Sequence, residues 1–275
     1  MGKDYECDRP PTADAGSLQG RKLPSPAVSH AARILRYLAR KGAPMAGAAI
    51  ARDVGISASS CFNLLKTLTA EGLLSFDPDG KQYTIGLGVL EVARGVLGAD
   101  EIVRSSAAVL NALATQHQVT VGLWRKNEKN RLTLVAIGES SAPARIHLEI
   151  GQRQPIAAGA AGRAWLSTST LGRSQIANLF AEVRWQKEPD FEDYLSEVIA
   201  ARTSNLAMDN EKLNRSIVTL ASPVRMPGKG GDARHVLTAS TFAGALDSIR
   251  LKSLGRDVVR SSDRLAAHSG ESTDP

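Results

Sequence analysis

Apolar residues recur at the spacing of an α-helix in three short segments near the start of the chain. The first segment, "VSHAARILRYLARKG", ends at Gly42 and Pro44, and the second, "AGAAIARDVG", stops at Gly55. The third, "SASSCFNLLKTLTAEG", begins at Ser57, a good N-cap, and ends at Gly72. The apolar face predicted for the first helix comprises Val28, Ala31, Ala32, Leu35, Leu38 and Ala39.

The pattern then changes to that of a β-hairpin. "LLSFDPDGKQYTI" predicts two short strands around a turn at residues 77–80, where Pro78 and Gly80 occupy positions that such turns favour. Residues 87–103, "LGVLEVARGVLGADEIV", place valines at helical spacing and predict a fourth helix. Gly95 and Gly98 each weaken it by about 1 kcal/mol relative to alanine. A weak helix with one apolar face takes stability from a partner, so we expect an interface here.

Farther along the chain, segments of strand and helix periodicity are mixed. The predicted strands are 119–126, 131–139, 145–150, 217–224 and 235–242, and the predicted helices are 107–118, 157–167, 172–183, 193–204 and 247–268. This arrangement predicts an α+β domain, one antiparallel sheet with packed helices, over residues 106–268. Residues 1–24, which lack periodicity, are expected to be a disordered leader, and 269–275 a C-terminal tail.

The second and third helices carry the features of a helix-turn-helix. Ala51 is small enough for two helices to cross closely, and Gly55 suits a turn with positive φ. The buried side of the third helix is then formed by Cys61, Leu64, Leu65 and Leu68. This motif places its second helix in the major groove of DNA.

The other side of the third helix is suited to DNA. Small residues at its start let it lie deep in the groove, and its free N–H groups can bind phosphate. Ser59 and Asn63 can hydrogen-bond base edges, and Phe62 can touch a thymine methyl group. The predicted DNA-binding residues, including basic ones on the first helix and the hairpin, are Arg33, Arg36, Ser57, Ala58, Ser59, Ser60, Phe62, Asn63, Lys66 and Lys81.

Charge supports this interpretation only modestly. The chain has a formal net charge of +6, and residues 25–90 hold seven basic and four acidic side chains, a balance of +3. A field this weak favours binding to double-stranded DNA as a dimer rather than as a lone module. The alternative use of such a module, a helical hairpin for packing or protein contact, stays open.

Signatures of catalysis and metal binding are missing from the sequence. The five histidines form neither an HExxH motif nor a Cys/His cluster, and there is no Gly-x-Ser-x-Gly elbow. The two cysteines, Cys7 and Cys61, predict no disulfide framework. No apolar run reaches the roughly 18 residues of a membrane span, and no signal-peptide core is present. We therefore expect a soluble cytoplasmic protein that is not an enzyme and needs no metal or cofactor.

Several segments together resemble the IclR family of bacterial transcription regulators. They are "SHAARILRYLARKG", "AAIARDVGISASSCFNLLKTLTAEGLLSFDPDGKQYTIGLGVLEVA", "GQRQPIAAGAAGRAWL", "MDNEKLNRSIVTLASPV" and "VLTASTF". The resemblance implies a winged helix-turn-helix over 25–86, a linker helix used in dimerisation over 87–105, and a GAF-like effector-binding domain over 106–268. It also implies operator binding as a dimer or a dimer of dimers. Where the family usually has a basic residue or His, this chain has Ala58, Phe62 and Asn63, so lower intrinsic affinity is expected.

The resemblance also implies a pocket for a small-molecule effector. Ala160, Ala161 and Gly162 correspond to positions that line the effector site in similar proteins, as do Asp209, Thr219, Thr238 and Ser240. An apolar wall is expected from Ile146, Leu148 and Ile217. Hydroxyls and free amides at a helix start suit a small carboxylate, such as an aromatic acid or a keto acid.

Two other functions compete with a ligand-responsive regulator. GAF-type domains are catalytic in some proteins when they carry reactive cysteines, but both cysteines of this chain precede the predicted domain. The chain is alternatively a degenerate regulator that acts without a small molecule.

Overall fold

The computed structural model describes residues 24–97, 100–225 and 231–268. The chain divides into two compact units, Met1–Ala99 and Asp100–Pro275. The expected tail and all of the expected leader except Pro24 lie outside the described residues.

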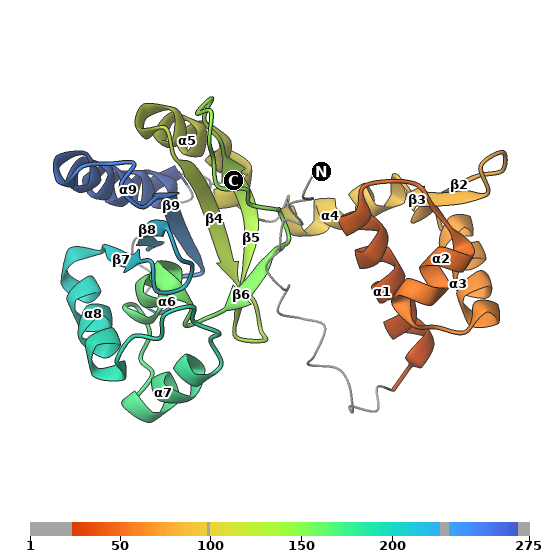
Figure 1. The fold of residues 1–275 in the computed structure, drawn as a ribbon, viewed down its shortest axis with the longest axis horizontal. Coiled ribbons are helices and arrows are strands. Elements are labelled where there is room, and N and C mark those ends of the chain that lie inside the picture. The colour runs from red at the N-terminus through yellow and green to blue at the C-terminus, as the bar shows by residue number, and fades with distance from the viewer. Residues whose placement is uncertain (1–23, 98–99, 226–230, 269–275) are drawn as a thin grey trace, which may run out of the picture. The chain divides into compact units, whose positions relative to one another are not determined.

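The first unit contains three packed helices, a small sheet and a further helix (Figure 1). Its helices are α1 (Pro26–Lys41), α2 (Gly47–Val54), α3 (Ala58–Ala70) and α4 (Gly88–Leu97), and its strands are β1 (Met45–Ala46), β2 (Leu74–Asp77) and β3 (Gln82–Ile85). The strands form one antiparallel sheet in the order β1-β3-β2, with Leu74 opposite Ile85. The predicted hairpin is confirmed, whereas the two-residue strand β1 was not predicted.

The core of this unit lies between α1, α2 and α3. Cys61, Leu65 and Leu68 of α3 are buried against Ala51 of α2, so the predicted inner face of α3 is confirmed. The predicted face of α1 is partly wrong, because Val28 is 68% exposed and Ala39 is exposed. Ile34, Tyr37 and Leu38 are buried instead, since larger side chains remove more apolar area from water than alanines do.

The second unit is a six-stranded sheet with helices on both faces (Figure 1). Its helices are α5 (Glu101–His117), α6 (Gly159–Leu166), α7 (Arg173–Ala181), α8 (Phe191–Ser204) and α9 (Ser248–His268). Its strands are β4 (Thr120–Lys126), β5 (Arg131–Gly138), β6 (Arg153–Pro155), β7 (Ala207–Asn210), β8 (Ile217–Val224) and β9 (His235–Phe242). They form an antiparallel sheet in the order β6-β5-β4-β9-β8-β7, which confirms the α+β prediction.

Alternation along the central strands separates two cores. Leu237 and Ala239 of β9 pack with α5 and α9, whereas Val236 packs with α6 on the opposite face. Thr238 and Ser240 alternate along β9 with Leu237 and Ala239, so they face the α6 side of the sheet. On this side, β7, β8 and β9 contact α6. This arrangement places a row of polar side chains beneath the start of α6.

Two sequence-based predictions in this region are wrong. Residues 87–103 do not form one helix, because Asp100 is extended and α5 begins anew at Glu101. The Asp100 carboxylate is buried and lies 2.8 Å from Nε2 of His235 and 3.3 Å from Nε of Arg125. These contacts hold Asp100 in its extended position just before α5.

The strand predicted at residues 145–150 is also absent, since this described segment has no sheet partner. Its alternation arises because Ile146 and Leu148 face inward while His147 and Glu149 are exposed. The carbonyl of Ile146 accepts a hydrogen bond from the Thr120 side chain at 2.9 Å, which holds the segment beside the sheet.

Candidate DNA-binding surface and effector pocket

The turn between α2 and α3 follows from two residues. Gly55 ends α2 with φ +69°, a conformation that costs glycine little and most other residues more. Ser57 is extended, and its Oγ accepts a hydrogen bond from the Ser60 N–H at 3.3 Å. A capped helix of 13 residues thus begins directly after the turn.

The outer face of α3 is open to solvent. Every residue predicted there is exposed in the first unit: Ser57, Ala58, Ser59, Ser60, Phe62, Asn63 and Lys66. Phe62 is 55% exposed, and the Lys66 ammonium lies 5.4 Å from the centre of its ring. This contact orients both side chains on the same surface, one turn apart.

The predicted basic contacts outside α3 differ in their surroundings. Arg36 and Lys81 are exposed. Arg33 is also exposed, but its guanidinium donates a hydrogen bond to the carbonyl of Val54, the last residue of α2. Arg33 therefore satisfies a free carbonyl at a helix end, a structural use that the sequence analysis did not anticipate.

A second contact joins α1 to α2. The Tyr37 hydroxyl donates a hydrogen bond to the Asp53 carboxylate at 2.6 Å. This bond, together with one from Arg52, lowers the pKa of Asp53, while the same carboxylate raises the pKa of Tyr37. Cys61 lies in the core nearby, where burial raises the pKa of its thiol and gives it no access to solvent.

The second unit contains a pocket of about 70 Å³ between the start of α6 and the sheet. A single water molecule needs about 10–15 Å³ on the same measure, so the pocket has room for more than one water molecule. Its lining consists of Trp124, Ile146, Leu148, Gln152, Gln154, Ala158, Gly159, Ala160, Ala161, Asp209, Leu213, Asn214, Ile217, Thr219, Thr238 and Ser240. Nine of the ten residues predicted for an effector site are in this set, although they come from five separate parts of the chain.

Gly162 is the predicted pocket residue that the structure places elsewhere. It is buried in α6, and a Cβ atom at this position would lie 2.2 Å from the carbonyl carbon of Ala157. The glycine is therefore required for the close approach of α6 to the preceding turn, and it does not line the cavity.

The polar groups of the pocket form a continuous row across three strands. Asp209 of β7 lies opposite Thr219 of β8, and Thr219 lies opposite Ser240 of β9. The hydroxyl oxygens of Thr219 and Ser240 are 3.0 Å apart. On the next pocket-facing position of β9, the Thr238 hydroxyl accepts a hydrogen bond from the Trp124 indole at 2.9 Å and donates to the carbonyl of Gly122.

The start of α6 adds backbone donors to this row. Its N-cap is Ala158, which has no side chain able to accept a hydrogen bond, and its first residue, Gly159, has φ +58°. The N–H groups of the first turn lack acceptors four residues earlier in the helix. The positive end of the helix therefore forms part of the pocket wall, at Gly159, Ala160 and Ala161.

Arg163, which the sequence analysis missed, is not among the lining residues and forms an ion pair with Asp209. Its Nη1 donates to Asp209 Oδ1 at 3.1 Å, and its Nε donates to Glu197 of α8. Arg163 is 1% exposed, and its guanidinium lies 4.6 Å from the ring centre of Tyr194. An arginine within "GAAGRAWL", a segment otherwise made of small and apolar residues, is the one sequence signal that pointed to this buried charge.

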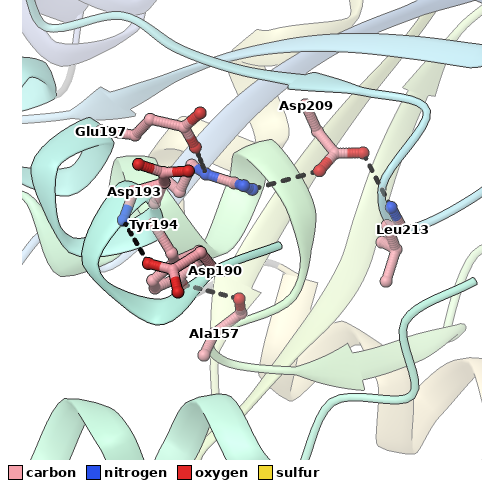
Figure 2. Close-up of polar contacts among 8 residues, drawn as sticks. Ala157, Asp190, Asp193, Tyr194, Glu197, Asp209 and Leu213 are labelled. Atoms are coloured by element: carbon pink, nitrogen blue, oxygen red, sulfur yellow. Dashed lines mark hydrogen bonds and ion pairs between the residues drawn. The ribbon is translucent and has the colours of Figure 1, made fainter. Parts of the chain in front are cut away.

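Tyr194 of α8 also belongs to this cluster, because its ring contacts Arg163. Its hydroxyl donates to the carbonyl of Ala157 at 2.8 Å, just before α6, and burial raises its pKa (Figure 2). Asp209 uses its second oxygen, Oδ2, to accept the N–H of Leu213 at 3.0 Å. Helices α6 and α8 and the β7–β8 loop are thus joined around one ion-pair network.

Within residues 24–97, 100–225 and 231–268 there is no group of three or more His, Cys, Asp or Glu side chains that could hold a metal ion. None of the helices in these same ranges is long and apolar enough to cross a membrane.

Comparisons with known proteins agree with the two-unit organisation. Residues 27–78 match the IclR helix-turn-helix domain, and residues 94–244 match the domain described as bacterial transcriptional regulator IclR C-terminal. The chain is 24% identical over 200 residues to the HTH-type transcriptional regulator XynR of Escherichia coli (strain K12), covering 72% of this chain and 79% of XynR.

Solved structures share the fold. An IclR transcriptional regulator from Alicyclobacillus acidocaldarius aligns over 90% of this chain and 100% of its own, with a TM-score of 0.75 and 22% identity. An IclR homolog from Microbacterium hydrocarbonoxydans, whose structure is complexed with 4-hydroxybenzoate, covers 88% of this chain and 99% of its own, with a TM-score of 0.69 and 13% identity.

Proposed function

The chain belongs to the IclR family of bacterial transcription regulators, and from this premise we propose that α3 binds operator DNA while the pocket beside α6 binds a small organic acid that controls that binding. As a family member with the helix-turn-helix domain, the protein is a transcriptional regulator. The exposed outer face of α3 is the single observation that carries the DNA-binding part of the proposal.

Several features support the choice of α3. Ala58, Ser59 and Ser60 are small and exposed, so the first turn of the helix can approach a groove closely. Asn63 can make two hydrogen bonds to adenine, and Phe62 can contact a thymine methyl group. Lys66 and Arg36 are exposed cations that suit phosphates, and we assign Lys81 at the hairpin tip the same role.

We assign effector binding to the pocket of the second unit. Free N–H groups at the start of α6 favour an anion, and the neighbouring hydroxyls of Thr219 and Ser240 supply polar contacts. Ile146, Leu148 and Ile217 supply the apolar wall. The 4-hydroxybenzoate complex of the Microbacterium hydrocarbonoxydans protein supports a small carboxylate as the class of ligand.

We further propose that the regulator binds DNA as a dimer or a dimer of dimers through the segment around α4. Leu87, Leu90 and Val92 are 80%, 61% and 67% exposed in the first unit, and a second copy of the chain would cover them. We place the protein in the cytoplasm with its DNA. We also propose that the pocket binds its ligand without chemistry, in keeping with relatives that are named as regulators.

The DNA-binding part is tested by a mobility-shift experiment with the fragment upstream of the gene itself, at two salt concentrations. We expect a shift at about 50 mM salt that weakens as salt rises, because phosphate contacts release counterions. No shift at low salt would contradict the proposal.

The effector part is tested by a thermal-shift screen of small organic acids, because a ligand that binds the folded state raises the melting temperature by mass action. An acid that stabilises the protein should also change the mobility shift. The substitutions Thr219→Val and Asp209→Ala should remove the response to that acid and leave DNA binding without it intact. Retention of the full response in both variants would contradict the assignment of this pocket.

A further inference from the structure

Helix α9 carries a row of exposed cations that belongs to neither the face of α3 nor the pocket. Leu254 and Val258 of α9 are buried and pack with α5 on one face of the sheet (Figure 1). Lys252, Arg256 and Arg260 are exposed on the other side of the helix, and we call these three residues the α9 row. Because they are four residues apart, they follow one another along the helix in steps of about 6 Å.

Neighbouring carboxylates do not neutralise the α9 row. Lys252 and Arg256 have no ion-pair partner within the residues that the structure describes. Arg260 lies 3.2 Å from Oδ1 of Asp257, but Oδ2 of the same carboxylate lies 3.0 Å from Nε2 of His117 in α5, and Asp257 is only 15% exposed. Like charges four residues apart destabilise a helix, so the stability of α9 does not explain the row.

The other side of the second unit has the opposite charge. Residues 182–197, which lead into α8 and form its first half, carry six acidic and two basic side chains, a balance of −4, and all eight are exposed. Residues 248–268 of α9 carry five arginines and lysines and two aspartates, a balance of +3. Helix α9 packs on one face of the sheet, whereas α8 packs against α6 on the other. A long polyanion would therefore be attracted to the α9 side and repelled from the α8 side.

The α9 row suits the phosphate backbone of DNA better than it suits a protein partner. Duplex DNA carries one negative charge per about 1.7 Å of its axis, so cations in steps of about 6 Å meet phosphates in any register. Protein interfaces bury aromatic or apolar anchors at their centre, whereas Ile249 is the one large apolar side chain exposed on the described residues of α9. The chain is also a DNA-binding regulator, so a duplex is the polyanion that it meets.

We propose that the α9 row is a second DNA-binding surface, which holds phosphates without reading the base sequence. Lysine and arginine donate hydrogen bonds to phosphate oxygens and displace condensed counterions. The inference goes beyond the assignment of α3, because the row belongs to the second unit and adds affinity rather than specificity. Contacts of this kind hold a regulator on non-operator DNA while it searches for its site.

The experiment compares the unmodified full chain with a triple variant, Lys252→Gln, Arg256→Gln and Arg260→Gln, on a long duplex of random sequence. Fluorescence anisotropy at several salt concentrations gives the slope of log affinity against log salt. Each lost phosphate contact reduces this slope by about 0.9, so the triple variant should show a slope smaller by about 2–3 for each bound chain. Its affinity at about 0.1 M salt should fall at least about tenfold, and Arg256→Gln alone should reduce the slope by about one.

A matched control removes the same charge from the acidic side of the same unit. Arg184, Lys187 and Arg202 lie in or just before α8 and are exposed, so their replacement by glutamine lowers the net charge as much as the first triple variant does. This control should keep the slope and the affinity of the unmodified chain. An equal loss in both triple variants would overturn the inference, because the effect would then come from net charge and not from a surface.

The remaining outcomes distinguish the α9 row from α3 and from a subunit contact. An unchanged slope in the α9 triple variant would overturn the inference and leave the assignment of α3 standing. If that variant instead dissociates in size-exclusion chromatography and regains full DNA affinity once a higher protein concentration restores association, the row is a subunit contact and the inference is overturned. If the unmodified chain binds no duplex at all, the assignment of α3 fails, and the inference fails with it.

Discussion

Helices α3 and α6 begin with similar sequences, "ASSC" and "GAAG", yet the two helix starts have opposite environments. The first turn of α3 is exposed and capped by Ser57, apart from Cys61 on its inner side. All eight residues of α6 are buried, and its N-cap, Ala158, provides no side-chain acceptor. Small residues at a helix start therefore do not define one function. What covers the helix determines whether a macromolecule or a small molecule can reach it.

The same contrast holds for the charges. The cations on and near the outer face of α3 lie at the surface, where salt screens them and where they can contact phosphate. The cation of α6, Arg163, is buried and committed to Glu197 and Asp209. Substitutions of these cations should therefore change binding in the first unit and stability in the second.

The largest expected effect is on the buried charge. Arg163→Met leaves Asp209 buried without its ion partner, so we expect a loss of about 3–5 kcal/mol in the unfolding free energy of the second unit. The three tryptophans, Trp124, Trp165 and Trp185, all lie in that unit, so their fluorescence during urea denaturation reports on it alone.

The matched control is Arg173→Met, which removes an exposed pair with Glu192. Such pairs contribute about 0–1 kcal/mol, so this variant should unfold nearly as the unmodified protein does. An equally small change in Arg163→Met would show that the buried network does not support α6.

The next effect concerns DNA recognition by α3. Asn63→Ala should weaken binding to the preferred site by about 1–3 kcal/mol and reduce discrimination between sites, because a base contact is lost. Arg36→Ala should weaken all sequences alike and reduce the slope of affinity against salt by about one, because a phosphate contact is lost. Titrations on preferred and random DNA at several salt concentrations measure both. The same loss of discrimination in both variants would contradict these roles.

A smaller effect is expected from the side-chain cap that α3 has and α6 lacks. Ser57→Ala removes the acceptor for the Ser60 N–H and should destabilise the first unit by about 1 kcal/mol. Thermal unfolding followed by circular dichroism measures this change. The tryptophan signal of the second unit should not move, and a shift in that signal would mean that the two units do not unfold independently.

The smallest effect should appear on acidification. The pKa of Asp53 is lowered by the hydrogen bonds from Tyr37 and Arg52. These bonds therefore stabilise the folded first unit at pH values above the pKa of an unfolded aspartate. That contribution disappears as the pH falls through the lowered pKa of the folded state. Asp53→Asn should therefore flatten the acid side of the stability curve of the first unit, measured by circular dichroism. An unchanged dependence of stability on pH in this variant would contradict a role for these two hydrogen bonds.

The regular parts of both units could be predicted from the sequence because local periodicity reports which side of an element is buried. The inner face of α3 and the strands β4, β5, β8 and β9 are examples. Residues 145–150 alternate as a strand does, yet a strand also needs a partner, and pairing is not visible in a single segment. The break before α5 was missed for a similar reason, since Asp100 is fixed by His235 and Arg125, which are distant in sequence.

The pocket was predictable only to the extent that the family resemblance supplied it, whereas the DNA-binding face of α3 could be predicted from the pattern of residues. Periodicity placed Ser59, Asn63 and Lys66 on an outer face because the inner face was clear. The pocket residues come from strands and loops whose meeting depends on the order of the whole sheet. Gly162 and Arg163 depend on backbone approach and on a buried ion pair, and neither leaves a local pattern beyond the residue type itself.

Hydrogen–deuterium exchange on the full chain, with and without a DNA fragment that it binds, tests the central contrast most directly. The amides of residues 58 and 59 lack intrahelical acceptors and, unlike the Ser60 N–H that Ser57 caps, should exchange quickly in the free protein. We predict that DNA slows exchange in residues 57–67 and leaves residues 157–166 at the start of α6 unchanged. Bound DNA that leaves 57–67 unprotected while slowing exchange elsewhere would contradict the account.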